Sequence, residues 1–336
     1  MDDTLAEVQA PPANPRPWRR RIVLAARIGA AVALVYFVAA TTVHQWSAVS
    51  ETFHRLSWPV VALSLVAAVL AIGTTAMAWR AAIDDLDHTV PVAAAGQVFL
   101  VGQLGKYLPG SVWSYVLQME LGRRVGIPRA RAFLASLITI GLGITVGLAF
   151  GALGLPATLN ATHTAAHSGT ARAAFWSAVI LLPIGLVCAH PGVLNRLVGL
   201  LLRLMRREPL DKPLTWRGVL GTSGWAAAGY LLFAVHLWLL ARTQSAPGWS
   251  GLVACLGAIS LAIAVSTVVV IAPSGIGVRE FMIAIALAGI GVSFGTAYAL
   301  ALASRLIITV ADVLAAGLAA FAAVRQVRRD QVRAAP

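Results

Sequence analysis

The sequence contains few charged residues and few cysteines. Only 12% of its 336 residues are Asp, Glu, Lys or Arg, whereas soluble domains carry about 25%. This deficit excludes an ordinary soluble domain. The two cysteines, Cys188 and Cys255, lie in or beside apolar runs and outside any CxxC or CxxH pairing. Their placement argues against a disulfide framework and against a structural zinc site.

Motifs that carry catalytic chemistry are also missing. The sequence has no GxSxG, no HExxH, no P-loop and no aspartate-rich metal motif. We therefore expect a protein that is not an enzyme and that needs no cofactor and no metal. The net charge is +13, and the Lys and Arg residues that produce it flank apolar runs. Such basic residues usually set membrane topology and face anionic lipid headgroups. Because no nucleic-acid recognition fold accompanies this charge, we expect membrane lipids as partners and no nucleic acid.

Long apolar runs dominate what is present, since 59% of the residues are hydrophobic. The first six runs are each near the ~20 residues that a helix needs to cross a bilayer. The last, 279–324, is too long for one crossing and is split at the turn signal GIGVSFG, 289–295. The sequence predicts an all-α polytopic membrane helical bundle with about eight transmembrane helices. The tail 1–21 and the basic tail 326–336 enclose a membrane domain over 22–325. The predicted spans are 22–43, 59–79, 132–155, 171–189, 218–241, 250–272 and the two halves of 279–324.

Positive charge is distributed unevenly between the loops. Lys and Arg gather in the tail up to Arg27, in 80–131, in 190–217 and from Arg325 onward, whereas the intervening loops hold single arginines. Loops rich in Lys and Arg stay in the cytoplasm. The asymmetry therefore predicts a multi-pass protein of the plasma membrane with both termini cytoplasmic.

The segment 93–119 contains an unusual stretch, GQLGKYLPGSVW at 102–113. Arg80 before it and Arg123 after it belong to the same side, so the chain must enter and leave on that side. At about 1.5 Å per helical residue, 27 residues are too few for two crossings. We expect a re-entrant hairpin. The alternative is a pair of amphipathic helices lying on the cytoplasmic surface.

Two Pro- and Gly-containing breaks are predicted to form the functional site. A helix broken at membrane depth leaves backbone groups that lipid cannot satisfy, so such breaks line cavities. The helix that follows presents its positive end there, and a nearby cation strengthens the attraction for an anion such as a lipid phosphate. The alternative is a pair of interfacial loops with snorkelling Lys106 and Arg279. The candidate headgroup-binding residues are Gly105, Lys106, Tyr107, Pro109, Gly110 and Ser111 in the first break and Pro273, Ser274, Gly275, Gly277, Arg279 and Glu280 in the second, with Arg305 in the last apolar run as a supporting charge.

The last apolar run carries charges on one helical face. Arg305, Thr309 and Asp312 are spaced i, i+4 and i+7. A charge inside a span costs about 2.5–3.5 kcal/mol on insertion scales, so these side chains are expected to face the protein interior. Arg305 could pair with Asp312 or with Glu280, either as a structural ion pair or in a ligand or proton-relay role. His236 is expected to pack or to form an interhelical hydrogen bond.

These residues resemble the motifs of a known family. GQLGKYLPGSVW, then GRRVGIP at 122–128, APSGIGVREFMIAIAL at 272–287 and ALALASRL at 299–306 are similar to the motifs of the lysylphosphatidylglycerol synthase transmembrane-region family, whose members are flippase-like. The resemblance spans about residues 20–325 and implies a membrane domain that binds and moves a polar-headed lipid, with Arg279, Glu280 and Arg305 in its signature. No aminoacyltransferase half is expected here. The crossing 132–155 lacks the acidic-basic pair that the resemblance leads us to expect.

We therefore expect a lipid flippase-like protein that takes an anionic or polar-headed lipid, either a phospholipid or a polyprenyl-phosphate-linked lipid. The alternative is a non-transporting membrane partner of a cell-envelope glycosyltransferase or lipid-modifying enzyme. A secondary transporter of a small anion and an enzyme acting on lipid rank below these two.

Overall fold

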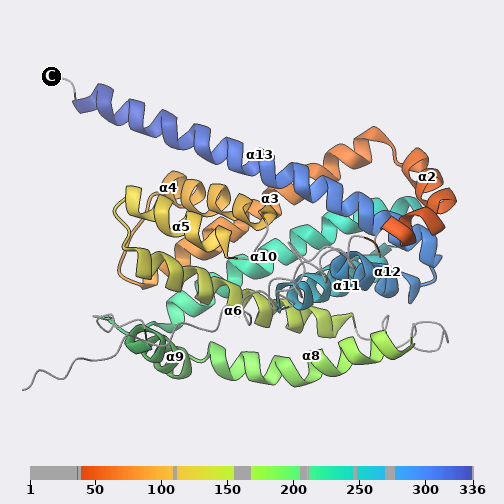
Figure 1. Ribbon diagram of the computed structural model, residues 1–336, viewed down its shortest axis with the longest axis horizontal. Helices are drawn as coiled ribbons and strands as arrows, with labels where there is room; N and C mark the ends of the chain where they lie inside the picture. The colour runs from red at the N-terminus through yellow and green to blue at the C-terminus, as the bar shows by residue number, and fades with distance from the viewer. Residues whose placement is uncertain are drawn as a thin grey trace, which may run out of the picture.

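The computed structural model describes residues 36, 39–108, 112–154, 168–204, 210, 212–244, 248–268 and 277–334, and this part of the chain is all-helical. Its long α-helices, drawn in Figure 1, are α2 (Trp46–Arg55), α3 (Trp58–Asp85), α5 (Trp113–Arg124), α6 (Arg129–Leu153), α8 (Ser168–Ala189), α9 (Pro191–Leu204), α10 (Trp216–Ala241), α11 (Gly248–Val268), α12 (Val278–Ala288) and α13 (Phe294–Ala334). Shorter turns are α4 (Val92–Gly96), the π-helical η1 (Gln97–Val101) and the 3₁₀ turns η2 (Leu104–Tyr107) and η3 (Arg242–Gln244).

Five described helices, α3, α6, α10, α11 and α13, are long and apolar enough to cross a membrane. A sixth candidate is the pair α8 and α9, which bends by 83°. Most of the predicted span 22–43 lies outside the described residues. The crossing expected over 279–289 is instead α12, whose 11 residues cover only about 16 Å, half of a bilayer core. The predicted total of eight crossings therefore stays a prediction.

The centre of the bundle is the pair α3 and α10, on which α6 packs. Small residues allow the close approach, as is typical of membrane helices. A Cβ on Gly229 of α10 would come within 2.6 Å of the Thr74 hydroxyl of α3. On the α6 side, the buried Trp79 indole donates a hydrogen bond of 3.1 Å to Ser136. Helices α8 and α9 lie outside α6, and α13 runs along the opposite side of the molecule (Figure 1).

One end of the bundle collects the charged loops. The backbone N–H of Thr215, just before α10, donates to Asp85 at the end of α3. Lys212 pairs with Asp87 at 2.9 Å, and this hydrogen bond lowers the pKa of Asp87. At the same end, hydrogen bonds from Arg123 and Arg129 lower the pKa of Glu120 to about 2. Loops that were predicted to share the cytoplasmic side therefore meet at one end of the molecule.

The segment 92–124 forms a two-armed hairpin that enters from this charged end. The first arm runs through α4, η1 and η2, and α5 is the second arm. The arms touch at Gly105, where a Cβ would lie 2.6 Å from the backbone nitrogen of Ser114. The arms contact α3, α6 and α13, and Val98, Phe99 and Gln118 are buried. The hairpin thus packs into the bundle, as a re-entrant segment does, rather than lying apart on its surface.

A second hairpin, α11 and α12, enters from the opposite end. Helix α11 begins just after α10 ends, and it runs antiparallel to α6: Gly257 lies against Gly154, and Ala264 lies against Gly147. Helix α12 packs on α11 and α13. The chain then turns at Gly291, with φ 93°, and enters α13 beside α2. The two hairpins therefore point toward each other from opposite ends of one bundle.

Candidate functional site

The first hairpin ends its first arm on α13. Lys106 Nζ lies 2.6 Å from Asp312 Oδ2, and the Tyr107 hydroxyl donates to the same oxygen at 2.5 Å. Asp312 is only 4% exposed, whereas 28% of the Lys106 side chain is accessible. Gly105 is buried where the arms meet. The buried Asp312 carboxylate therefore accepts hydrogen bonds from two residues of the first hairpin, Lys106 and Tyr107, and fixes the position of Lys106.

The second hairpin is fixed to α13 by Glu280. Its Oε2 accepts a 2.6 Å hydrogen bond from the backbone N–H of Gly277, and its Oε1 accepts from Arg305 Nη1 at 3.1 Å. Gly277 has φ 83°, a left-handed conformation that only glycine adopts without strain. Glu280 thus caps the start of α12, at the positive end of that helix, and joins it to α13.

This pairing decides between the two alternatives for Arg305. The pair of Arg305 with Asp312 is wrong, and the pair of Arg305 with Glu280 is confirmed. Residues i and i+7 share a face but lie two turns apart, about 10 Å along the axis. Asp312 is reached instead by the hairpin, since Lys106 and Tyr107 arrive from outside α13. Sequence spacing within one helix could not reveal a partner 206 positions away.

Among the described residues, Arg279 is the one cationic side chain with a buried donor atom that has no hydrogen-bond partner. Its side chain is half-buried, and its Nη2 atom is buried with no hydrogen-bond partner. The guanidinium lies within electrostatic range of Arg305, Glu280, Asp312 and Tyr107. A buried donor without an acceptor costs free energy until an acceptor arrives. Arg279 is therefore the group in this cluster that is ready to bind an anion.

Described residues of both hairpins contact one face of α13. Arg305 lies about 16 Å along the helix from Phe294, and Asp312 lies about 21 Å before Gln326, where the apolar window ends. Both positions are thus inside the apolar part of α13. Six predicted site residues lie outside the described residues: Pro109, Gly110, Ser111, Pro273, Ser274 and Gly275. The eight described ones, Gly105, Lys106, Tyr107, Gly277, Arg279, Glu280, Arg305 and Asp312, belong to the two hairpins and to the α13 face that they contact.

A buried polar chain beside this cluster was only partly foreseen. His236 on α10 is fully buried. Its Nδ1 lies 2.7 Å from the Ser64 hydroxyl of α3, and its Nε2 lies 2.9 Å from the Ser304 hydroxyl of α13. The expected interhelical hydrogen bond is thus confirmed. The two serines were missed because serine within an apolar helix is common, and the only signal was that Ser304 precedes Arg305.

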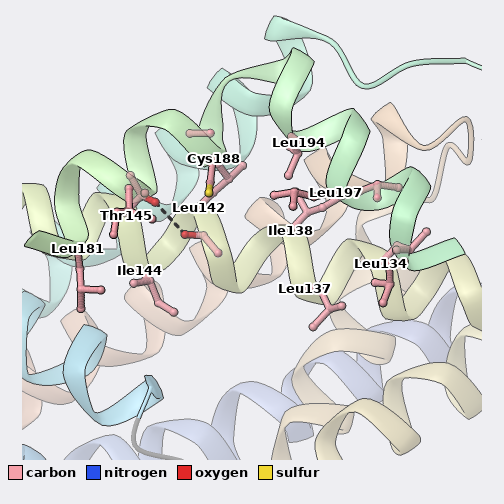
Figure 2. Close-up of a pocket in the computed structure, with 16 residues that line it drawn as sticks. Leu134, Leu137, Ile138, Leu142, Ile144, Thr145, Leu181, Cys188, Leu194 and Leu197 are labelled. Atoms are coloured by element: carbon pink, nitrogen blue, oxygen red, sulfur yellow. Dashed lines mark hydrogen bonds between the residues drawn. The ribbon is translucent and has the colours of Figure 1, made fainter. Parts of the chain in front are cut away.

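Cavities lie in the described part of the bundle, and two of them border α6. One, of about 110 Å³, is lined by residues of α3, α6, α10 and α11, and Tyr230 on its wall is within electrostatic range of Arg279. The other, of about 370 Å³, lies between α6, α8 and α9. Figure 2 shows Leu194, Leu197 and Cys188 facing Ile138 and Leu142 across it. Its walls carry no charged side chain, so they suit hydrocarbon and not a headgroup.

Within the described residues, no group of three or more His, Cys, Asp or Glu side chains is placed to hold a metal ion. The chemistry available at the α13 face is therefore that of three cations, two carboxylates and a phenol. Such a set of groups has the chemistry to bind and orient an anion.

A comparison with family models adds the decisive sequence observation. The model of the lysylphosphatidylglycerol synthase transmembrane region matches residues 22–316, which is most of the chain. The chain belongs to this family. The match contains both hairpins and all of the site on α13. No curated protein matches the chain. Membership of the lysylphosphatidylglycerol synthase transmembrane-region family supports a multi-pass membrane protein linked to lipid handling.

Proposed function

We propose that the chain binds a lipid by its phosphate at the meeting point of the two hairpins and moves it between leaflets. The observation that carries this proposal is the buried, unpartnered Nη2 of Arg279 beside two hairpin ends held on one face of α13. Guanidinium groups bind phosphate oxygens strongly, and more so away from water. Membership of a family whose name refers to lipid synthesis supports a lipid as the ligand.

The two hairpins enter the bundle from opposite ends, which supports movement of the lipid between leaflets as well as its binding. The first hairpin opens toward the charged end of the bundle, and the second opens toward the other end, so the site lies between two entrances. Paired discontinuous helices around a central site are typical of transporters that expose that site alternately to the two sides. We further propose a plasma-membrane location with the charged end, and both termini, in the cytoplasm.

The test is lipid translocation by the purified protein in phosphatidylcholine vesicles. The probe is phosphatidylglycerol labelled with a fluorophore on one acyl chain, and dithionite quenches the label in the outer leaflet only. We expect the wild-type chain to move label between leaflets, with or without an imposed pH gradient. Lys106→Gln and Arg279→Gln should reduce the rate at least tenfold, because each removes a charge that contacts the headgroup.

The matched control is Lys212→Gln, which removes an exposed lysine that is also paired with an aspartate. Its rate should equal that of the wild type. Unchanged rates in Lys106→Gln and Arg279→Gln would contradict the proposed site. If the folded wild-type chain moves no lipid and instead depends on a co-purifying enzyme, the non-transporting partner of a cell-envelope enzyme becomes the better description.

A further inference from the structure

The charges around the site do not balance. The apolar parts of the two hairpins and of α13 carry three cations, Lys106, Arg279 and Arg305, against two carboxylates, Glu280 and Asp312, which leaves one positive charge. The undescribed segments between the hairpin arms, 109–111 and 269–276, contain no charged residue. The count is therefore complete for the apolar parts of both hairpins.

Each carboxylate is already assigned to one cation. Asp312 accepts from Lys106, and Glu280 accepts from Arg305. Both carboxylates are nearly inaccessible, at 4% and 3% exposure. Arg279 is left over, and its Nη2 has no partner. The single excess charge is thus located on one residue, and it lies inside the bundle, where an uncompensated charge is costly.

We propose that the headgroup bound here is a phosphodiester, which carries one negative charge and neutralises the site completely. A phosphate monoester carries about −1.5 to −2 charges at pH 7, so it would leave an excess negative charge next to Glu280 and Asp312. The inference rests on the proposed function and narrows its substrate. Phosphodiester lipids, including phospholipids and polyprenyl phosphates esterified with a sugar, fit the site, whereas free polyprenyl phosphate and diphosphate-linked lipids do not.

The test is a binding competition in dodecyl maltoside, a detergent without charge or phosphate, followed by native mass spectrometry. The probes are phosphatidylglycerol, a diester, and phosphatidic acid, a monoester, with identical acyl chains at pH 8. The wild-type chain should retain phosphatidylglycerol about tenfold more strongly, since the second charge meets two carboxylates at short range. Oleate, a single negative charge without phosphate, should bind more weakly than phosphatidylglycerol.

Asp312→Asn sharpens the test because it keeps an acceptor oxygen for Lys106 and Tyr107 while raising the site charge to two. Its preference should reverse toward phosphatidic acid. Glu280→Gln makes the same change at the other carboxylate and serves if Asp312→Asn does not fold. The matched control, Asp87→Asn, alters the exposed carboxylate paired with Lys212, and asparagine tolerates the left-handed φ of 64° there. Its preference should equal that of the wild type.

Equal retention of the two phospholipids, a wild-type preference for phosphatidic acid, strong retention of oleate, or an unchanged preference in both charge variants would each overturn the inference. These outcomes leave translocation itself standing if labelled phosphatidylglycerol still crosses the vesicle membrane. Selective retention without any crossing would have the opposite meaning, because the site would then be a diester site in a protein that does not transport. If the wild type retains neither lipid, the inference and the proposed binding step both fail.

Discussion

Two Lys–Asp ion pairs in this molecule have nearly the same length and opposite surroundings. Lys106 and Asp312 are 2.6 Å apart, with side chains 28% and 4% exposed. Lys212 and Asp87 are 2.9 Å apart, with side chains 69% and 50% exposed. The outer pair joins two loops at the charged end, and the inner pair joins the tip of a hairpin to α13.

The comparison shows that exposure, rather than length, decides what an ion pair does. An exposed pair gains little because water screens it and both side chains lose freedom. A buried pair costs desolvation when it forms, and it becomes very unfavourable when one partner is removed. The inner pair therefore adds little net free energy of folding, but the loss of either Lys106 or Asp312 alone should destabilise the protein.

The largest expected effect comes from breaking the inner pair. Lys106→Met removes the cation and leaves Asp312 buried with only the Tyr107 hydroxyl as a partner, which should lower the free energy of unfolding by about 3 kcal/mol. The thermal unfolding midpoint of the detergent-solubilised protein measures this change. Lys212→Met, its counterpart in the outer pair, should leave the midpoint unchanged.

A double variant tests the reason for that loss. In Lys106→Met with Asp312→Asn the buried carboxylate that lost its cation is removed as well, so the double variant should unfold at a higher temperature than Lys106→Met alone. If the double variant is instead the less stable of the two, the ion pair itself stabilises the hairpin, and the stranded carboxylate is not the cause.

The next effect concerns the close approach of the hairpin arms that positions Lys106. In Gly105→Ala the new Cβ would meet backbone atoms of Trp113 and Ser114 at 2.6–2.8 Å, and backbone cannot swing away as a side chain can. We expect a loss of about 1–3 kcal/mol, measured by the same unfolding midpoint. Gly73→Ala, where nothing lies within 4 Å of the new Cβ, should be neutral or slightly stabilising.

A smaller loss is expected in the buried polar chain next to Arg305. Ser304→Ala leaves the Nε2 atom of His236 without its described partner, which should cost about 1 kcal/mol in a membrane interior. Ser50→Ala, which removes an exposed hydroxyl from α2, is the control and should leave the unfolding midpoint unchanged. Equal midpoints for the two variants would mean that water or another group replaces the Ser304 hydroxyl.

The smallest effect is expected at the charged end. Because Arg123 and Arg129 lower the pKa of Glu120 to about 2, its carboxylate favours the folded state above the unfolded pKa of about 4.3, and this contribution disappears as the pH falls toward 2. The unfolding midpoint of Glu120→Gln should therefore lie slightly below that of the wild type at pH 6 and approach it at pH 3. High salt should shrink the difference at pH 6. A difference that grows on acidification would contradict this assignment.

The sequence was sufficient for features encoded by local composition. Apolar length located α3, α6, α10 and α11, and GIGVSFG located the turn before α13, because each signal depends only on neighbouring residues. The charge runs identified the loops that meet at one end. The first half of the split run was expected to be a crossing, but the turn signal at 289–295 leaves too few residues before it to span a bilayer, and α12 accordingly has only 11 residues.

The sequence was sufficient to choose the charged residues of the candidate site, but not to say which of them pair with each other. Lys106, Arg279, Glu280, Arg305 and Asp312 stand out because charge inside apolar runs is rare. Their partners depend on how two hairpins dock on a third helix, and such contacts between distant segments have no periodic signature. The spacing on one helix offered Arg305 as a partner for Asp312, as one of two alternatives, whereas in the fold Asp312 pairs with Lys106.

Helix α13 is one straight rod of 41 residues, and it holds both hairpins by separate ion pairs two turns apart. The rod fixes the distance between the two anchor points, so neither hairpin end can move along it without giving up its own carboxylate or its own arginine. A slide of α13 by one helical turn, about 5.4 Å, would break both contacts in a single stroke. Bending of one hairpin would release only one side. The long helix thereby acts as a mechanical link between the two hairpins.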